Sequence, residues 1–334
     1  MNGMTNINVI GGSGFIGTRL VSRLIKNSEI SVKIIDKAPS KKFPELTRVG
    51  DVRSVQELQE CISEQSIIVN LAAEHRDDVR PVSLYSDVNI QGAENICEVA
   101  REKNVSIIIF TSTVAVYGFA PIGTDETGNI APFNEYGRTK YEAESIFRAW
   151  QSEAADERLL VIIRPTVVFG EKNRGNVYNL LNQIASGRFV MVGNGENRKS
   201  MAYVENVTAF IEFSMKFEPG VHVYNFVDKP DFTMNSLVAR VRKILGRPAR
   251  LGMRLPFFPG YMIGKVFDLV ARVSGKNLAI SSIRVKKFCA DSVYGTSISN
   301  TGFVSPVPLE NALEQTVRYE FMESHDGEDV FYTE

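Results

Sequence analysis

The sequence predicts an α/β protein in which a doubly wound parallel sheet is joined to a smaller, mixed C-terminal domain. In the first half of the chain, short apolar runs alternate with amphipathic helical patterns, and these runs are apolar throughout. Continuous apolar runs are typical of parallel strands covered on both faces, and strands that alternate with helices build parallel sheets. After about residue 170 the pattern loosens into Gly- and Asn-rich loops, mixed helices and short strands.

In the first half of the chain, predicted strands and helices alternate. Strands are predicted where β-branched residues gather, at 7–10, 31–36, 66–72, 106–112 and 159–165. Helices are predicted where apolar residues recur at helical spacing, at 15–26, 55–64, 92–103 and 136–152. We therefore expect a first domain at 1–170, to which some later segments return, and a second domain at 171–322. Residues 323–334 are expected to form a loosely held acidic tail.

The composition excludes several classes of protein. The chain has 334 residues, 44% hydrophobic and 23% charged, and a formal net charge of −1, so no overall field favours nucleic acid. Its three cysteines form no CxxC pair and its three histidines are scattered, which predicts neither a disulfide framework nor a metal site. No signal-peptide pattern and no uncharged apolar run of about 18 residues is found, so a cytoplasmic protein is expected.

A glycine-rich loop, GGSGFIG, directly follows the first predicted strand and opens the first helix. In such a loop Gly11 allows the tight turn, Gly14 lets the backbone approach a pyrophosphate, and Gly17 permits close packing of helix and strand. The phosphates would then lie on the N–H groups at the helix start, beside Phe15 and Ile16. A purely structural turn is the alternative, but the strand before the loop and the helix after it favour a dinucleotide site.

The acidic Asp36 at the end of the second strand indicates which dinucleotide is bound. A carboxylate there accepts hydrogen bonds from the ribose hydroxyls and repels a 2′-phosphate, so NAD is predicted over NADP. The adjacent Lys37 weakens this preference. Further cofactor contacts are expected near other strand ends, at Asp51, Val52, Leu71, Ala72, Ala73 and Pro165. Taken singly, each of these positions is better explained by ordinary packing than by a cofactor contact.

A YxxxK motif at the start of the helix predicted at 136–152 is the candidate catalytic group. The spacing of four places Tyr136 and Lys140 on one helix face. A free phenol has a pKa near ~10, but a neighbouring ammonium and a positively charged nicotinamide favour the phenolate, which makes a usable base. The preceding strand ends in Ser112 and Thr113, whose hydroxyls could hold a substrate oxygen. The alternative for Thr113 is a hydrogen bond to local backbone.

Together these motifs resemble the extended short-chain dehydrogenase/reductases, which have a Rossmann fold, and within them the NAD-dependent epimerase/dehydratase family. The resemblance runs from about residue 6 to residue 320. It implies catalytic roles for Thr113, Tyr136 and Lys140, with Tyr136 and Lys140 also contacting the cofactor. It further implies a homodimer, which is common in the family.

The second half departs from the family pattern for nucleotide-sugar substrates. The segment RPTVVFG has Val167 where such members carry an Asn that meets the substrate diphosphate. The run GNGENRKSMAYV places Lys199 and Ser200 where they carry Arg and Asp. This predicts an altered nucleotide–diphosphate pocket.

The blocks LAAEHRDDV, KSMAYV, YNFVDKPD and SIRVKKFCA resemble a narrower subgroup of the family. That subgroup comprises bacterial 4-epimerases of N-acetylglucosamine linked to undecaprenyl diphosphate, which serve surface polysaccharide (O-antigen) synthesis. The resemblance implies an NAD-dependent 4-epimerase. The sequence does not show which basic residues hold the diphosphate, and Arg174, Lys199 and Arg284 are our candidates. The alternatives are a UDP-N-acetylglucosamine 4-epimerase, an NADH-dependent 4-keto nucleotide-sugar reductase, and a non-catalytic dinucleotide-sensing module.

Residues 255–277 form an apolar stretch in which four charges recur at steps of three and four. If the stretch is helical, Lys265, Asp268, Arg272 and Lys276 form one narrow polar stripe, and the remaining arc is apolar. Such an arc suits either a helix packed in the C-terminal domain or at a dimer contact, or a helix lying in a membrane interface. With a lipid-linked substrate, peripheral contact with the inner face of the plasma membrane is the favoured prediction.

Overall fold

A computed structural model describes residues 4–76, 79–249, 252–274, 282–325 and 327–333. Its main feature is a seven-stranded parallel sheet in the order β10-β6-β5-β4-β1-β2-β3. The strands are β1 (Thr5–Ile10), β2 (Ile30–Asp36), β3 (Thr47–Val49), β4 (Ile67–Asn70), β5 (Ile107–Thr111), β6 (Leu159–Pro165) and β10 (Gly220–Phe226). The strand order reverses between β1 and β4, where doubly wound sheets bind their ligands. The predicted fold class is confirmed.

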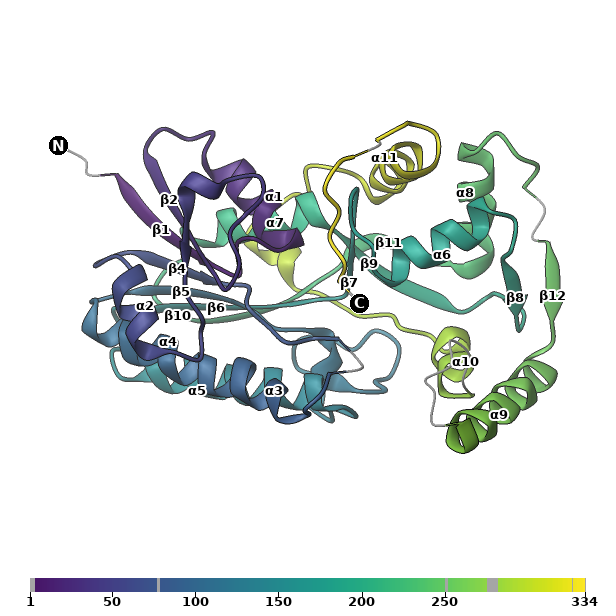
Figure 1. Cartoon of the computed structure of the whole chain (residues 1–334), viewed down its shortest axis with the longest axis horizontal. Helices are drawn as coiled ribbons and strands as arrows, with labels where there is room; N and C mark the ends of the chain where they lie inside the picture. The colour runs from purple at the N-terminus through teal and green to yellow at the C-terminus, as the bar shows by residue number, and fades with distance from the viewer. Residues whose placement is uncertain (1–3, 77–78, 250–251, 275–281, 326, 334) are drawn as a thin grey trace.

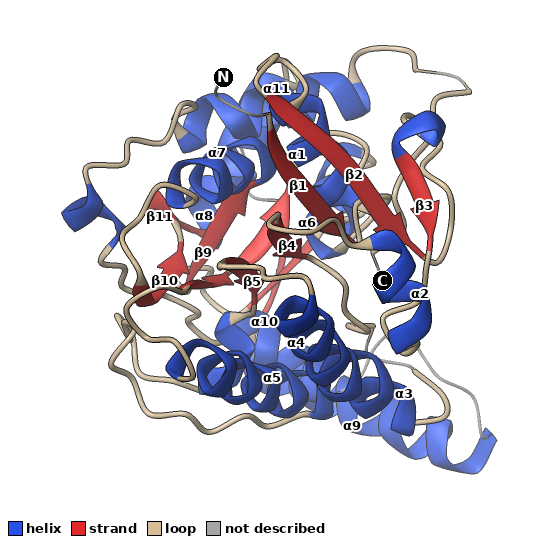
Figure 2. Ribbon diagram, turned by 90° about the vertical axis from the view of Figure 1, so that its left-hand side faces the viewer, coloured by secondary structure: helices blue, strands red, loops and turns tan. Residues whose placement is uncertain are grey.

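Helices cover both faces of this sheet, which explains why its strands are apolar throughout (Figure 2). One face is covered by α1 (Phe15–Leu24) and α7 (Val204–Ser214). The other is covered by α2 (Val55–Cys61), α4 (Gly92–Glu102) and α5 (Glu135–Ser152). A short helix, α3 (Ser83–Ser86), and a π-helical turn at 87–91 lead into α4. Every residue of β6 is buried, as expected for a strand near the centre of a doubly covered sheet.

The second domain is smaller and mixed, and lies beyond the carboxyl ends of the sheet (Figure 1). Its three-stranded sheet consists of β7 (Val167–Phe169), β9 (Arg198–Tyr203) and β11 (Asp228–Thr233). A core of apolar side chains joins this sheet to α6 (Asn176–Ala185), α8 (Met234–Ile244) and α11 (Leu309–Phe321). A parallel pair, β8 (Val190–Val192) and β12 (Met253–Leu255), leads to α9 (Phe257–Ser274) and α10 (Ser282–Cys289) at the far end.

The C-terminal segment is held in place, so the prediction of a loose tail is wrong. Phe331 donates its N–H to the Lys172 carbonyl and accepts from the N–H of Arg174, both at 2.8 Å. Its ring lies 5.9 Å from that of Phe15. Lys172 also pairs with Glu328 at 2.5 Å. The acidic composition gave no indication that an extended segment with an aromatic residue crosses between the two domains. The C-terminal end of the chain lies near the centre of the molecule (Figure 1).

Within the described ranges, no helix combines the length and apolar character needed to cross a membrane. The same residues contain no cluster of metal-ligating side chains.

Candidate active site

A cavity of about 890 Å³ lies at the carboxyl ends of the central strands, between the two domains. Every residue predicted to contact the cofactor lines it: Gly11, Gly14, Phe15, Ile16, Gly17, Asp36, Lys37, Asp51, Val52, Leu71, Ala72, Ala73, Tyr136, Lys140 and Pro165. The structure therefore brings together in one cavity residues that span about 150 positions of sequence. Their individual contacts stay predictions.

The glycine loop is tightly packed on its protein side. Gly11 has φ of 77°, and a Cβ there would lie 2.7 Å from the backbone nitrogen of Ala72. A Cβ on Gly17 would lie 2.5 Å from the Cα of Gly12. At Gly14, by contrast, a Cβ would meet only the Gly11 carbonyl at 3.4 Å, and no side chain caps the start of α1. The loop thus offers an uncapped helix N-terminus to the cavity, which suits a pyrophosphate.

Asp36 closes the adjacent end of the cavity. Its carboxylate accepts from the backbone N–H of Ser13 at 3.0 Å and of Ala38 at 3.2 Å. These bonds hold the carboxylate beside the glycine loop, where it can meet ribose hydroxyls. The sequence analysis missed Arg53, which also lines the cavity and pairs with Asp51 at 2.6 Å. Hydrogen bonds from Arg53 hold the pKa of Asp51 below its usual range, so this carboxylate is charged at neutral pH.

Removing the charge of Asp36 is expected to relax the choice between the two dinucleotides. Asp36→Asn should bind NADP at least about tenfold more tightly than the unaltered protein does, because repulsion of the 2′-phosphate is lost. The measurement is calorimetric titration with NAD and NADP. Lys37→Ala is the matched control and should weaken NADP binding, because it removes a neighbouring positive charge. An unchanged NADP affinity in Asp36→Asn would contradict the assignment.

The candidate catalytic residues come from the start of α5 and the end of β5. Asn134 caps α5 by accepting from the N–H of Gly137 at 2.9 Å. A Cβ on Gly137 would lie 2.6 Å from the carbonyl oxygen of Ala115, so glycine lets the helix lie against the segment after β5. Thr113, Tyr136 and Lys140 consequently line one part of the cavity.

Thr113 makes the local backbone bond weighed from the sequence, and its predicted contact with a substrate oxygen stays a prediction. Its hydroxyl accepts from the N–H of Ala115 at 3.1 Å, a local backbone bond that caps the next helical turn. It also hydrogen bonds the phenol of Tyr136. The backbone bond fixes the side chain, and the second bond directs it toward the candidate base.

Burial shifts the pKa values of Tyr136 and Lys140 toward each residue's neutral form. Withdrawal from water raises the pKa of Tyr136 to about 12, and the bond from Thr113 opposes this in part. Burial lowers the pKa of the Lys140 ammonium to about 7, opposed by the carboxylate of Glu144. The Lys140 Nζ lies 4.2 Å from the centre of the Phe110 ring. The phenol by itself therefore keeps its proton, and a further positive charge in the cavity is needed to make it a base.

A buried ion pair lies directly beneath these residues. The carboxylate of Glu144, with no exposed surface, accepts from Arg164 at 2.8 and 2.5 Å and from Ser112 at 2.6 Å. Arg164 also donates to the hydroxyl of Tyr117 at 2.6 Å. Ser112, predicted to bind substrate, lines the cavity but directs its hydroxyl into this network. The network anchors β5, α5 and β6 to one another at the site.

The three basic candidates for the substrate diphosphate have different positions. Lys199 lines the cavity, donates to the Ala290 carbonyl at 2.6 Å, and has its pKa lowered by burial. Arg174 does not line it, and instead pairs with Glu320 at 2.7 Å and stacks on Tyr178. The side chain of Arg284 lies outside the described residues. Of the three, only Lys199 is placed at the cavity.

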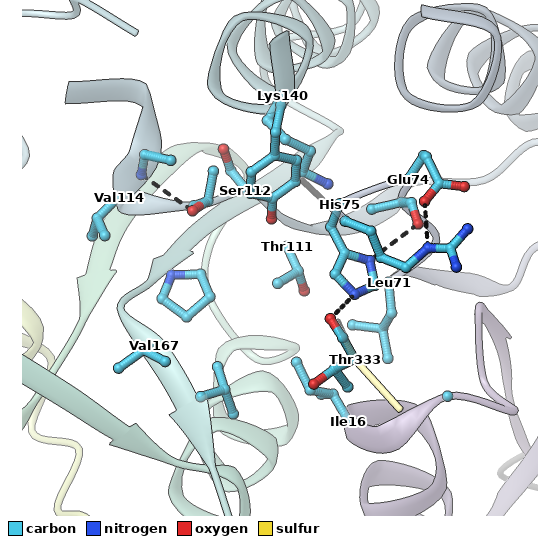
Figure 3. A pocket seen from close by; sticks show the side chains of 18 of the residues that line it. Ile16, Leu71, Glu74, His75, Thr111, Ser112, Val114, Lys140, Val167 and Thr333 are labelled. Carbon is cyan, nitrogen blue, oxygen red and sulfur yellow. Dashed lines mark hydrogen bonds and ion pairs between the residues drawn. The ribbon is translucent and has the colours of Figure 1, made fainter. Parts of the chain in front are cut away.

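Other cavity residues had no signal in the sequence. Figure 3 shows His75 reaching across the cavity to the C-terminal segment, where its Nε2 lies 2.9 Å from the Thr333 carbonyl oxygen. The Thr333 hydroxyl donates to the Asn173 side chain at 2.7 Å. The His75 ring centre is 6.5 Å from that of Tyr136. Val167, by contrast, was singled out from the sequence as the residue at the position of the nucleotide-sugar Asn, and it also lines the cavity.

Comparison with known proteins agrees with this geometry. Residues 7–226 match the NAD dependent epimerase/dehydratase family. The chain is 47% identical over 331 residues to an N-acetyl-alpha-D-glucosaminyl-diphospho-ditrans,octacis-undecaprenol 4-epimerase of Escherichia coli O157:H7, covering 98% of this chain and 99% of that protein. It is 28% identical to a UDP-glucose 4-epimerase of Vibrio cholerae, covering 81% and 85% of the two chains.

The structural comparison agrees on the fold. A crystal structure of UDP-glucose 4-epimerase from Thermotoga maritima superposes with a TM-score of 0.73 at 22% identity, covering 94% of this chain and 98% of that one. A structure of MoeE5 in complex with UDP-glucuronic acid and NAD gives a TM-score of 0.73 at 20% identity, with the same two coverages. The extent of the family match, and the near full-length similarity to the E. coli enzyme, show that this chain belongs to the NAD dependent epimerase/dehydratase family.

Proposed function

We propose that this protein is a 4-epimerase that interconverts N-acetylglucosamine and N-acetylgalactosamine on undecaprenyl diphosphate, as a step in surface polysaccharide synthesis. The observation that carries the proposal is the 47% identity to the E. coli O157:H7 enzyme over nearly the whole of both chains. Two features of the cavity support it. Thr113, Tyr136 and Lys140 are all at the cavity, and Val167 and Lys199 replace the residues expected for a nucleotide diphosphate.

The residues at the cavity can perform the acid–base part of an epimerisation. Bound NAD supplies a reversible hydride acceptor for C4 of the sugar, and the glycine loop and Asp36 would hold it. Tyr136 takes the proton of the 4-hydroxyl, which Thr113 holds in place. The positive charges of Lys140 and of oxidised nicotinamide stabilise the phenolate. Once the 4-keto sugar has turned about its diphosphate linkage, the opposite face of C4 would receive the hydride back, and Tyr136 returns the proton to the C4 oxygen.

A lipid-linked substrate gives α9 a function at the membrane surface. In the described part of this helix, apolar side chains face outward: Phe258 is 70% and Val266 59% exposed, and Met262 and Ile263 are exposed too. Asp268, predicted to share one narrow polar stripe with Lys265, lies toward α10 and accepts from the Ser282 hydroxyl at 2.5 Å. An outward apolar face supports peripheral contact with the inner face of the plasma membrane. The proposal retains the homodimer implied by the family resemblance.

One experiment tests substrate and membrane contact together. Purified protein and NAD are incubated with N-acetylglucosaminyl-diphospho-undecaprenol in anionic liposomes, and separately with UDP-N-acetylglucosamine. The sugar is released by mild acid and identified. We expect N-acetylgalactosamine from the lipid, with the protein sedimenting with the liposomes. Conversion of the UDP-sugar alone would contradict the proposal, and stoichiometric oxidation of added NADH would indicate a keto-sugar reductase.

A further inference from the structure

A second hollow lies beside the active-site cavity, between the turn from β12 to α9 and the helix α10. This groove has a volume of about 770 Å³ and is open to solvent. Its lining includes Arg254, Pro256, Phe257, Lys286, Cys289 and Ala290. Ala290 lines the active-site cavity as well, so the two hollows meet at this residue.

The groove carries two exposed cations on an otherwise mostly apolar lining. Among the residues that the structure describes, no carboxylate lies within 4.0 Å of the charged nitrogens of Arg254 or Lys286. Arg254 donates to the side-chain oxygen of Asn235 at 3.1 Å, and Glu196 is bound to the amide nitrogen of the same Asn235. Positive charges that have no ion-pair partner in the described part of the chain, next to Pro256 and Phe257, suit an anion attached to an apolar chain.

The groove lies between the active-site cavity, which contains the candidate catalytic residues, and the outward face of α9. The Lys286 Nζ lies 5.8 Å from the centre of the Phe119 ring, and Phe119 lines the active-site cavity. On the cavity side of the junction, the Lys199 Nζ is held by the Ala290 carbonyl. On the other side, Phe257 belongs both to the groove and to the first turn of α9. The active-site cavity, the two cations and the apolar face of α9 therefore follow one another in space. The sugar, the diphosphate and the polyprenyl chain of a polyprenyl-diphospho-sugar follow one another in the same order.

We propose that this groove binds the diphosphate and the first isoprene units of the substrate, with Arg254 and Lys286 as counter-charges and Phe257 against the chain. The proposal rests on the proposed function, since it assigns the lipid half of that substrate. The sugar then reaches Tyr136 through the junction at Ala290, while the distal chain runs along α9 into the membrane. The residues that recognise the lipid diphosphate are thereby different from the residues that perform the chemistry on the sugar.

Binding of farnesyl diphosphate, a short and soluble probe, tests the groove directly. We expect calorimetric titration to show that the unaltered protein binds it at least about tenfold more tightly than inorganic diphosphate, because the chain adds apolar contact. Arg254→Ala/Lys286→Ala should weaken farnesyl diphosphate binding by at least about tenfold, and Phe257→Ser should bring its affinity close to that of inorganic diphosphate. The matched control is Lys26→Ala/Arg48→Ala, which removes the same charge from exposed positions outside both hollows. Equal affinity in the groove variant and the control would overturn the proposal.

Turnover of the lipid-linked sugar separates this proposal from the proposed function. We expect Arg254→Ala/Lys286→Ala to raise KM for N-acetylglucosaminyl-diphospho-undecaprenol by at least about tenfold with kcat retained, because neither residue lies at the reacting carbon. If the unaltered protein converts the lipid and the groove variant has the same KM, the groove assignment fails and the function stands. If the lipid is not converted while farnesyl diphosphate binding still depends on Arg254 and Lys286, the function fails and the groove stands as an anionic-lipid site.

Discussion

Tyr136→Phe is expected to lower turnover by roughly 10²–10⁴-fold while leaving NAD binding intact. The change removes only the phenol oxygen, the atom that carries the exchanged proton, and keeps the ring that lines the cavity. Lys140, Thr113 and the glycine loop are untouched, so the site remains assembled. The measurement is the initial rate of sugar epimerisation, with NAD affinity determined on the same preparation.

The neighbouring Tyr141→Phe is the matched control for that variant. Tyr141 lies on the outer side of α5, is 37% exposed and does not line the cavity. It should keep full activity. Since the pKa of Tyr136 lies above neutrality, its phenolate fraction and the rate should rise with pH in the unaltered protein, and this dependence should be absent from Tyr136→Phe. Substantial activity in Tyr136→Phe with the same pH dependence would exclude Tyr136 as the base.

Arg164→Met is expected to lower the free energy of unfolding by about 3–5 kcal/mol. The Glu144 carboxylate has no exposed surface and would keep only its bond from Ser112. An unpaired charge in the interior is far more costly than the absence of the whole pair. Arg164→Met/Glu144→Leu should therefore recover much of the loss. Urea unfolding can follow the fluorescence of Trp150, the only tryptophan of the chain, which is buried on α5.

The exposed pair Arg101–Glu153, at 2.6 Å, provides the comparison for this effect. Both side chains are in contact with water, so Glu153→Gln should cost less than about 1 kcal/mol. A similar cost for Arg164→Met and Glu153→Gln would contradict the view that the inner pair is a buried anchor. A double variant less stable than Arg164→Met alone would contradict it as well.

The predicted site residues that share the cavity are mostly those encoded by local motifs. Gly11, Gly14 and Gly17 act through the backbone of one turn, and their spacing is visible without knowledge of the fold. Tyr136 and Lys140 lie one helical turn apart, so their shared face also follows from spacing alone. These residues reach the same cavity because the carboxyl ends of parallel strands meet at one edge of the sheet.

What the sequence did not predict depends on long-range contacts. Glu144 resembles a surface charge of an amphipathic helix, and only the packing of α5 on β6 brings it to Arg164. Arg174 is near the cavity in sequence, but Glu320 of α11, 146 positions later, holds it elsewhere. The C-terminal segment was judged from its acidic residues, whereas Phe331 decides its position by packing on Phe15. In each case the partner is remote in the chain, and composition carries no information about it.

The position of β10 at the edge of the large sheet has a consequence for how the chain is made. This strand comes from residues 220–226, after α6, β8, β9 and α7 have been formed from intervening sequence. During synthesis, the strands β1 to β6 emerge first. The strand β10, which pairs with the outer edge of β6, emerges much later. A nascent chain ending near residue 170 would thus expose an apolar, unpaired edge, the kind of surface that aggregates and that chaperones protect. We expect the cofactor-binding half, expressed by itself, to be insoluble, because its sheet is completed by sequence from beyond it.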